Sequence, residues 1–292
     1  MPALRSFLNR CALSALLLLP AVGGAADIVV ASGQKVAFLG DSITQFGWNQ
    51  PAGYVNEVVS GLDSAGVKIT PLPAGVSGNT SKDMLARLQR DVLAKKPDWM
   101  TLSCGVNDVW HGDKGVDLEG YKSNIMAILD ACKAAGIKVV LLTSTPITEK
   151  LDSPQNVKLA TYNDFLHALA KERDLPLADL NADLQAAIKA KTKDSPALTV
   201  DGVHMANAGN MLMARGVLRA IGLSDAQLAA ADERWLDAPN TVAAQQVKLN
   251  ITLRQYAAIE RAAAAAGKPV DEWLGTRLRT DLAEVIAAAP AK

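Results

Sequence analysis

The sequence predicts an α/β protein, a three-layer α/β/α sandwich with a mostly parallel five-stranded sheet. Five short apolar runs are typical of strands, and most of them are continuously apolar rather than alternating. This is expected for a parallel sheet that helices cover on both faces. Segments with the periodicity of amphipathic helices separate these runs, so strand and helix alternate about five times along the chain.

The expected elements follow in chain order. Gly66 and Gly136 stand where two helices should end, because glycine readily adopts the left-handed conformation of helix C-termini. Residues 80–83 have the pattern of a capping box that opens the second helix. We expect strands at 36–39, 67–72, 99–103, 139–142 and 177–180. We expect helices around 54–62, 84–92, 118–132, 159–169 and 207–221.

The chain has 292 residues, of which 49% are hydrophobic, enough for one sizeable core or for a core and a small appendage. Basic and acidic residues balance at 30 each, so net charge gives no argument for a nucleic-acid partner. We expect a main domain at 27–225 and a helical extension at 226–292, where the composition becomes rich in alanine and charge.

The first 26 residues have the pattern of an export signal. Arg5 and Arg10 precede an apolar stretch at about 11–22, and small residues lead to Ala26, after which we expect cleavage. The apolar stretch is too short for a comfortable membrane span. We therefore predict no membrane span and a secreted or periplasmic protein.

The extension at 226–292 contains a strictly alternating run at 247–253 and two helical stretches at 254–266 and 270–288. This order resembles the ribbon-helix-helix module, in which two chains pair their strands, and the resemblance implies a homodimer joined through the extension. The alternative is a strand at the edge of the main domain with both helices packed on it. DNA binding by such strands is not expected, because the outward residues of the run carry one charge.

Two cysteines, Cys104 and Cys132, remain after the signal segment. An oxidising compartment permits a disulfide between them. The alternative is two buried thiols, because free cysteine is often buried. Neither has metal-ligand spacing, and no zinc or phosphate-binding motif occurs elsewhere, so we predict neither a metal nor a cofactor.

Four polar segments lie far apart in the sequence, at 40–42, 77–80, 105–108 and 201–204. The first three follow the first three predicted strands, and loops beyond the carboxyl ends of parallel strands share one edge of the sheet. Together the segments contain an alcohol, an imidazole, a carboxylate and amide donors. Acyl transfer by an activated serine requires these groups.

Ser42 is the candidate nucleophile; the alternative is a serine that caps a helix after a strand. A serine hydroxyl needs a base within hydrogen-bond reach. Of His111, His167 and His204, the last is the candidate, since His167 lies in a helix with apolar periodicity. Asp201, three residues before His204, can orient the imidazole, and the alternative there is an ordinary Asp-Gly turn.

The four segments occur in the order of the sequence blocks of the SGNH or GDSL-type hydrolase superfamily, which the chain resembles over most of its length before the extension. The resemblance implies a flavodoxin-like sheet and a carboxylic ester hydrolase that forms an acyl-enzyme. It also implies an oxyanion hole made by Ser42, Gly78 and Asn107. Members often have proline after the catalytic histidine, where this chain has Met205. Asp41 is expected to brace the nucleophile turn by accepting backbone hydrogen bonds.

Residues near these segments are candidates for substrate binding. Trp48 follows the first segment, Trp110 and His111 follow the third, and Asn79 lies in the second. Asn79 and Asp108 can instead hold their loops, and both indoles can instead pack in the core. Aromatic faces at an exported polar site suit a sugar ring. We therefore predict a carbohydrate O-acetylesterase, whose partner is a small ester or an acetylated carbohydrate.

Two alternatives remain open. A short-chain lipid or aryl esterase, a thioesterase or a lysophospholipase would use the same reacting groups. A protein of another class, a carbohydrate-binding or assembly protein with a vestigial site, would keep the four segments without turnover. Reaction with a serine-directed fluorophosphonate separates an enzyme from that last alternative.

Overall fold

The structure, a computed structural model, describes residues 28–193, 195–237 and 252–287. The chain divides into two compact units, Met1–Asn240 and Thr241–Lys292. The predicted export signal lies outside the described residues, and so does most of the predicted strand at 247–253. The last two residues of that run instead begin a helix.

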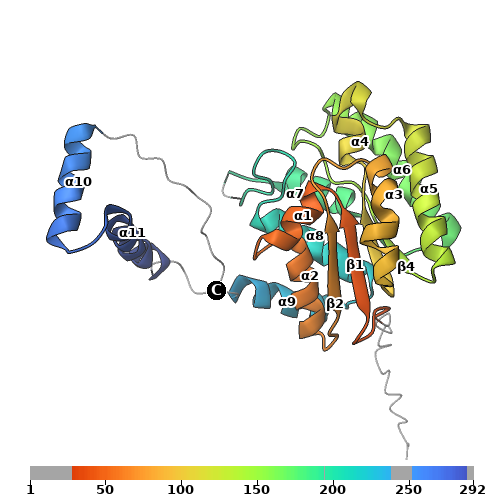
Figure 1. The fold of residues 1–292 in the computed structure, drawn as a ribbon, viewed down its shortest axis with the longest axis horizontal. Coiled ribbons are helices and arrows are strands. Elements are labelled where there is room, and N and C mark those ends of the chain that lie inside the picture. The colour runs from red at the N-terminus through yellow and green to blue at the C-terminus, as the bar shows by residue number, and fades with distance from the viewer. Residues whose placement is uncertain (1–27, 194, 238–251, 288–292) are drawn as a thin grey trace, which may run out of the picture. The chain divides into compact units, whose positions relative to one another are not determined.

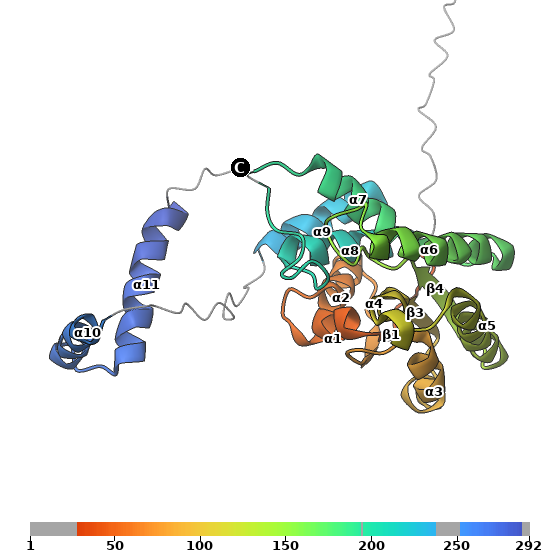
Figure 2. The ribbon, with the colours of Figure 1, turned by 90° about the horizontal axis from the view of Figure 1, so that it is seen from above.

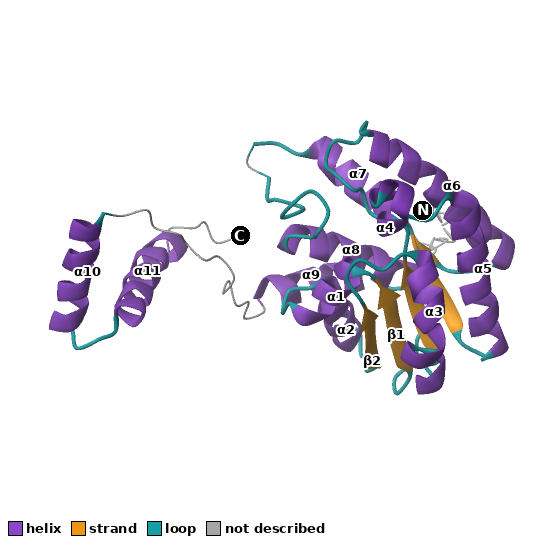
Figure 3. Ribbon diagram, turned by 45° about the horizontal axis from the view of Figure 1, so that its top comes forward, coloured by secondary structure: helices purple, strands orange, loops and turns teal. Residues whose placement is uncertain are grey.

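The strands of the first unit are β1 (Lys35–Gly40), β2 (Thr70–Gly75), β3 (Trp99–Ser103), β4 (Lys138–Leu142) and β5 (Leu177–Ala178). They form one parallel sheet in the order β2-β1-β3-β4-β5 (Figures 1 and 3). Leu39 pairs with Ala74 on one side and Leu102 on the other, so three strands end at the same edge. The predicted five-stranded parallel sheet is confirmed.

Strand β2 covers Thr70–Gly75 rather than the predicted 67–72. Gly66 adopts a φ of 82°, and the N–H of Val67 donates to the carbonyl of Leu62 at 2.9 Å. Val67 therefore completes the end of the preceding helix and is not available to the sheet. The strand contains two prolines, which are tolerated because β2 lies at the edge.

The helices of the first unit are α1 (Ser42–Asn49), α2 (Tyr54–Ser64), α3 (Ser81–Asp91), α4 (Val106–Trp110), α5 (Leu118–Ala134), α6 (Pro154–Arg173), α7 (Leu180–Ala190), α8 (Asn207–Ala220) and α9 (Asp225–Asp237), with 3-10 turns at Leu93–Lys95 and Gly112–Lys114. On one side of the sheet, α2 packs against α1, α8 and α9, and α8 contacts α7. On the other side, α5 packs against α3 and α6 (Figure 2). The three-layer sandwich is thus confirmed.

The predicted starts and ends of elements follow local hydrogen bonding. Thr80 caps α3 in a reciprocal capping box with Asp83, as predicted for 80–83. The predicted strand at 177–180 is shorter in the structure, because Asp179 caps α7 by accepting the N–H of Ala182 at 3.2 Å. That cap commits the chain to a helix directly after Ala178.

Helix α9 belongs to the first unit, so this unit reaches past the predicted boundary at 225. The indole N–H of Trp235 donates to the carbonyl of Glu57 at 3.1 Å, and Arg234 pairs with Asp63 at 3.0 Å. Trp235 is buried against the core of the first unit. The unit extends to Asn240 because α9 covers apolar surface of α2.

The second unit contains α10 (Leu253–Ala265) and α11 (Val270–Ala287), which contact each other. Their positions agree with the predicted helical stretches at 254–266 and 270–288. Thr252 caps α10 in a second capping box. Within the described part of the chain, no helix is long and apolar enough to cross a membrane.

Cys104 and Cys132 are buried free thiols, which confirms the second of the two interpretations given above. Burial raises the pKa of the Cys132 thiol to about 11. Burial also raises the pKa of Cys104 well above its usual value, and the neighbouring Asp108 acts in the same direction. Both thiols therefore remain protonated and unreactive at neutral pH.

Candidate active site

The nucleophile segment lies at the carboxyl end of β1, where the chain turns into α1. Asp41 caps this helix, and its Oδ1 accepts the N–H of Ile43 at 2.9 Å, which confirms the bracing role predicted for it. Ser42 is the first helical residue, so the alternative of Ser42 as the cap is wrong. A side chain at Gly40 would meet Thr44 Oγ1 at 2.0 Å, so the turn requires glycine there.

His204 and Asp201 meet Ser42 in a continuous chain of hydrogen bonds. His204 Nε2 lies 2.9 Å from Ser42 Oγ, and His204 Nδ1 lies 2.6 Å from Asp201 Oδ2. Asp201 Oδ1 accepts the N–H groups of Val203 at 3.0 Å and His204 at 2.8 Å. Gly202 adopts a φ of 96°, which lets the turn fold back on the carboxylate. The fold thus brings together residues 162 positions apart.

The carboxylate of Asp201 is held in its charged form. Burial alone would raise the pKa of Asp201, but hydrogen bonds from the His204 side chain and from two backbone N–H groups outweigh burial, so the pKa is lowered. An ionised Asp201 keeps the proton of the neutral imidazole on Nδ1. Nε2 is then free to accept the proton of the serine hydroxyl.

Asn210, on α8, holds the loop that carries the histidine, and the sequence patterns above do not predict it. Its side chain is buried; Nδ2 donates to the carbonyl of Ala206 at 3.2 Å, and Oδ1 accepts the N–H of Tyr54 at 3.0 Å. Met205, which stands where the superfamily often has proline, is buried and packs in the core. Apolar packing and the Asn210 contacts together position this loop.

The predicted oxyanion donors come from three segments. Gly78 adopts a φ of 79° with open space where a side chain would begin. Among the described residues, the backbone N–H groups of Ser42 and Gly78 donate to no protein acceptor. Asn107 is buried, and its Nδ2 donates to the carbonyl of Asn79 at 3.0 Å and lies 3.4 Å from Asp41 Oδ2. These contacts fix the orientation of the amide.

Two buried carboxyl groups support these loops. Burial raises the pKa of Asp41 to about 6, against the lowering effects of the Ile43 N–H and of His204. Asp108 accepts the N–H of Ser81 at 3.0 Å and its hydroxyl at 2.5 Å. Burial also raises the pKa of Asp108. Asp108 therefore joins α4 to the first turn of α3, the loop-holding role expected for it.

Arg87, on α3, ties the first two segments together. Its guanidinium donates to the carbonyls of Gly40, the last residue of β1, and Ala74, the penultimate residue of β2, both at 2.8 Å. It also donates to Asn79 Oδ1 at 2.6 Å, and Asp91 balances its charge at 3.0 Å. Arg87 is not among the residues predicted for the site. An arginine within the apolar stripe of a predicted helix is the signal that indicates a buried cation.

Two aromatic side chains flank the imidazole. The ring centroids of Phe46 and Trp110 lie 5.1 and 6.5 Å from that of His204, and the two residues are 37% and 45% exposed. Trp48 instead packs against the core. Phe46, and not Trp48, lies beside the imidazole, because a residue four positions after Ser42 shares its face of the helix.

The other candidates do not contact the serine or the imidazole. The side chain of Asn79 instead holds its loop, because its Oδ1 accepts a hydrogen bond from Arg87. His111 is exposed at the end of α4. His167, on α6, pairs with Asp179 at 3.2 Å. Within the described part of the chain, no group of three or more histidine, cysteine or acidic residues could hold a metal ion.

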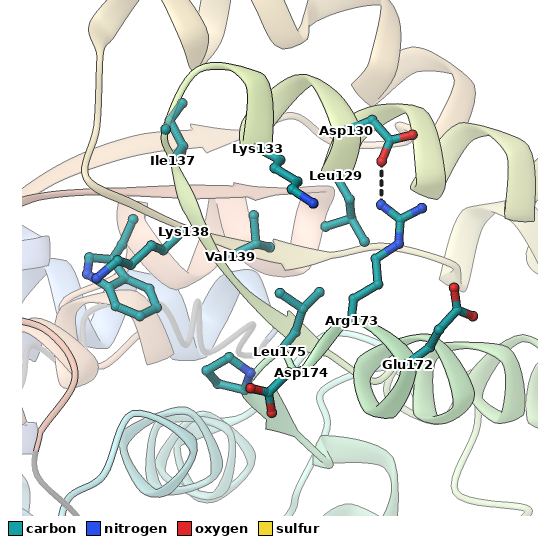
Figure 4. Close-up of a pocket in the computed structure, with 13 residues that line it drawn as sticks. Leu129, Asp130, Lys133, Ile137, Lys138, Val139, Glu172, Arg173, Asp174 and Leu175 are labelled. Carbon is teal, nitrogen blue, oxygen red and sulfur yellow. Dashed lines mark hydrogen bonds and ion pairs between the residues drawn. The ribbon is translucent and has the colours of Figure 1, made fainter.

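A cavity of about 770 Å³ lies at the amino-terminal ends of β3, β4 and β5, the opposite end of the sheet from Ser42 (Figure 4). Leu129 and Leu175 give it an apolar lining, and Asp130 pairs with Arg173 at its rim. The lining contains no serine, cysteine or histidine. The cavity therefore lacks the side chains of the acyl-transfer chemistry found at the carboxyl ends.

Comparison with known families agrees with this site. The model of the GDSL-like lipase/acylhydrolase family matches residues 38–212, which contain all four polar segments. The chain therefore belongs to this family and is a carboxylic ester hydrolase.

Individual relatives include an acetylxylan esterase of Geobacillus stearothermophilus, 32% identical over 214 residues that cover 66% of this chain and 96% of the relative. An uncharacterized lipoprotein of Bacillus subtilis, YqeF, is 27% identical over 172 residues, covering 50% of this chain and 71% of the relative. The crystal structure of the Geobacillus enzyme superposes with a TM-score of 0.61 at 31% identity and covers 67% of this chain and 97% of that one. Another acetyl xylan esterase, AlAXEase, gives a TM-score of 0.58 at 32% identity, covering 64% and 98%.

Proposed function

We propose that this chain is an exported serine esterase that removes O-acetyl groups from carbohydrate. Ser42 acts as the nucleophile, His204 as the general base and Asp201 as the carboxylate that orients the base. The observation that carries the proposal is the chain of hydrogen bonds, 2.9 Å from Ser42 Oγ to His204 Nε2 and 2.6 Å from Nδ1 to Asp201. A serine nucleophile requires this arrangement.

In the first half of the reaction, Ser42 Oγ attacks the acetyl carbon while its proton passes to His204 Nε2. We assign stabilisation of the developing oxyanion to the N–H groups of Ser42 and Gly78 and to Asn107 Nδ2. One N–H of Asn107 is committed to the carbonyl of Asn79, and the other makes only a long contact of 3.4 Å with a carboxylate. The bond to the sugar oxygen then breaks, and His204 gives its proton to that oxygen.

In the second half, water takes the place of the sugar. His204 removes a proton from the water as it attacks the acyl carbon, and acetate leaves as Ser42 Oγ regains its proton. The imidazole becomes positively charged in both halves. Asp201 stabilises that charge, and its lowered pKa keeps it ionised while the charge is present.

The relatives support carbohydrate as the substrate class. The Geobacillus enzyme is an acetylxylan esterase, also described as an acetyl-xylooligosaccharide esterase. Solved variants in which an aspartate, a serine or a histidine is replaced by alanine are described as its catalytic mutants. The same three residue types meet in this chain, so we extend both the roles and the substrate class to it. Export fits such a substrate, because polysaccharides of this kind lie outside the cell.

The test is release of acetate from acetylated xylo-oligosaccharides by the purified chain, compared with p-nitrophenyl acetate and longer p-nitrophenyl esters. We expect both acetates to be hydrolysed and turnover to fall as the acyl chain lengthens. Ser42→Ala should lower kcat by at least about 1,000-fold and abolish labelling by a fluorophosphonate. Ser123→Ala, which removes an exposed hydroxyl on α5, should change neither.

Three other results would redirect the assignment. Faster hydrolysis of long acyl chains than of sugar acetates would favour a lipid, aryl or thioester substrate. Absence of labelling in the folded wild-type chain would favour a carbohydrate-binding or assembly protein with a vestigial site. Labelling that persists in Ser42→Ala would overturn the choice of nucleophile.

We also propose that the second unit joins two copies of the chain. Large apolar side chains of α10 and α11 are exposed, and clustered exposed apolar residues are typical of interaction surfaces. They are Leu253, Tyr256, Leu278 and Leu282. The hydrolase domain in this proposal ends near Asn240, because α9 is packed into the first unit.

A further inference from the structure

Phe46 and Trp110 lie beside the reacting groups, and the proposed mechanism uses neither. Phe46 is one helical turn after Ser42 on α1, and Trp110 is the last residue of α4, three positions after Asn107. Their rings are inclined to the imidazole of His204 by 58° and 52°. Aromatic side chains therefore flank the imidazole from two helices, α1, which begins at Ser42, and α4, which contains Asn107.

The fold does not require these two rings to be exposed. Ile43 and Val109, their neighbours on the same two helices, are 4% and 3% exposed, whereas Phe46 and Trp110 are 37% and 45% exposed. Large apolar side chains that face solvent together are typical of ligand-binding surfaces. Two such side chains beside one imidazole indicate a surface for substrate.

In the proposed mechanism, the imidazole must face the alcohol half of an ester. His204 Nε2 takes the proton of Ser42 and passes it to the oxygen of the departing alcohol, so that oxygen must come within hydrogen-bond reach of Nε2. The carbonyl oxygen of the acyl half is instead held by the oxyanion donors, which include Gly78 and Asn107. Side chains packed beside the imidazole therefore contact the alcohol rather than the acyl chain.

We propose that Phe46 and Trp110 form an alcohol subsite, which binds the sugar ring that carries the acetyl group and selects the alcohol without selecting the acyl chain. This inference rests on the proposed function. A sugar ring presents C–H groups on its faces, which pack on aromatic surface while the hydroxyl groups at its edge stay in contact with water. The sugar leaves once the acyl-enzyme forms, so the two rings act in acylation and not in hydrolysis of the acyl-enzyme.

The experiment uses the full chain with Phe46→Ala or Trp110→Ala, and Phe46→Tyr as the conservative variant. Three quantities are measured: kcat/KM for acetylated xylo-oligosaccharides, the ratio of kcat/KM for p-nitrophenyl acetate to that for p-nitrophenyl butyrate, and inhibition of p-nitrophenyl acetate hydrolysis by unacetylated xylo-oligosaccharide. Met126→Ala is the control, because Met126 on α5 is an exposed apolar residue (36%) of the same unit and lies in the helical layer on the other side of the sheet from α1.

Each alanine variant should lower kcat/KM for the sugar acetate by about tenfold and weaken inhibition by the sugar to a similar extent. The acetate-to-butyrate ratio should not change, and Phe46→Tyr should retain sugar binding. An unchanged kcat/KM for the sugar acetate in the folded variants, or a changed acetate-to-butyrate ratio, would overturn the proposal.

Failure of the proposed function gives a different result. If wild-type chain releases acetate from aryl acetates and not from sugars, the carbohydrate assignment fails. The subsite is then tested with a series of acetates of different alcohols. An alcohol preference that the alanine variants leave unaltered would overturn the subsite as well, and a lost preference would support it for another alcohol.

Discussion

The two ends of the sheet carry different groups of side chains. At the amino-terminal end, a cavity of about 770 Å³ has an apolar lining and a charged rim, with Asp130 paired to Arg173. At the carboxyl end, Ser42, His204 and Asp201 meet at hydrogen-bond distances. Cavity volume therefore does not identify the reacting end. Polar groups from different loops that contact one another do.

Chain direction explains the difference. Helices α1, α3 and α4 begin at the carboxyl edge, so unpaired backbone N–H groups and the positive ends of helix dipoles gather where an oxyanion must form. Helices α5 and α6 end at the amino-terminal edge, where Lys133 and Arg173 lie near their last carbonyls. A parallel α/β fold thus stabilises anions at one end only.

The largest expected effect is at the carboxyl end. Asn107→Ala should lower kcat/KM by about 100- to 1,000-fold, or about 3 to 4 kcal/mol, because it removes one of the proposed oxyanion donors. The matched change at the other end is Lys138→Ala. In the wild type, Lys138 Nζ lies 5.1 Å from the ring centroid of Trp99. Its removal should leave kcat/KM unchanged. Steady-state kinetics with p-nitrophenyl acetate measures both. Equal losses at the two ends would contradict the comparison.

A smaller effect on kcat/KM is expected from Arg87→Met, which removes the cation that links β1 to β2. Unfolding free energy should fall by about 3 kcal/mol, because buried carbonyls and Asp91 lose a partner. In the folded variant kcat should fall more than KM rises, because Arg87 no longer holds Asn79 and the segment at 77–80, which contains Gly78, is displaced. Arg87→Lys should be intermediate. A normal kcat in folded Arg87→Met would show that the residue serves stability alone.

The pH dependence of stability sharpens the comparison, since it arises from a buried residue that hydrogen-bonds to neither Ser42 nor His204. Burial, with a smaller effect from Asp232, raises the pKa of Glu57 to about 8, and Glu57 Oε2 has no hydrogen-bond partner among the described residues. Because the folded chain binds this proton more tightly than the unfolded chain, the stabilisation is complete below pH 4.5 and is lost as pH rises through 8.

Glu57→Gln should therefore reduce the loss of stability between pH 5 and 9 by about 4 kcal/mol. Thermal unfolding at a series of pH values measures this, and kcat at pH 7 should be unaffected. Asp41 has a pKa raised in the same direction, to about 6, so part of the loss below pH 7 should remain in the variant. A variant with the same pH profile as wild type would show that Glu57 is not the titrating group.

The smallest effect on catalysis is expected from truncation after Asn240. The site lies within the first unit, so kcat/KM should change by less than about twofold. Light scattering should show a monomer if the second unit joins two copies, and an unchanged mass would contradict that role. Truncation at 225 is the informative contrast, because it removes α9 and uncovers the buried surface around Trp235.

Features that depend on local sequence could be predicted. The continuously apolar strands, the capping box at Thr80 and the four polar segments each have a one-dimensional signal, and the parallel sheet places three of those segments at one edge. The start of β2 could not be located from apolarity, because Val67 is equally suited to a strand and to the end of a helix. Its hydrogen bond to Leu62 decides between the two.

Features that depend on long-range contacts were missed. The position of Arg87 in its helix can indicate a buried cation. Its partners on β1 and β2 are known only once the strands are placed beside it. Asn210 acquires its role only when α8 packs against the start of α2. Trp48 was predicted as a substrate-binding residue because aromatic faces suit sugars, and Phe46 was not considered, although helical spacing from Ser42 favours Phe46.

The separation of Ser42 from His204 has a consequence for biosynthesis. Under the proposed roles, a growing polypeptide that has not yet emerged as far as α8 contains the hydroxyl without its general base, so we expect it to be inert. We therefore expect hydrolytic activity only after α8 has docked and positioned the loop that carries His204. The time at which turnover begins during refolding would therefore report when that docking step occurs.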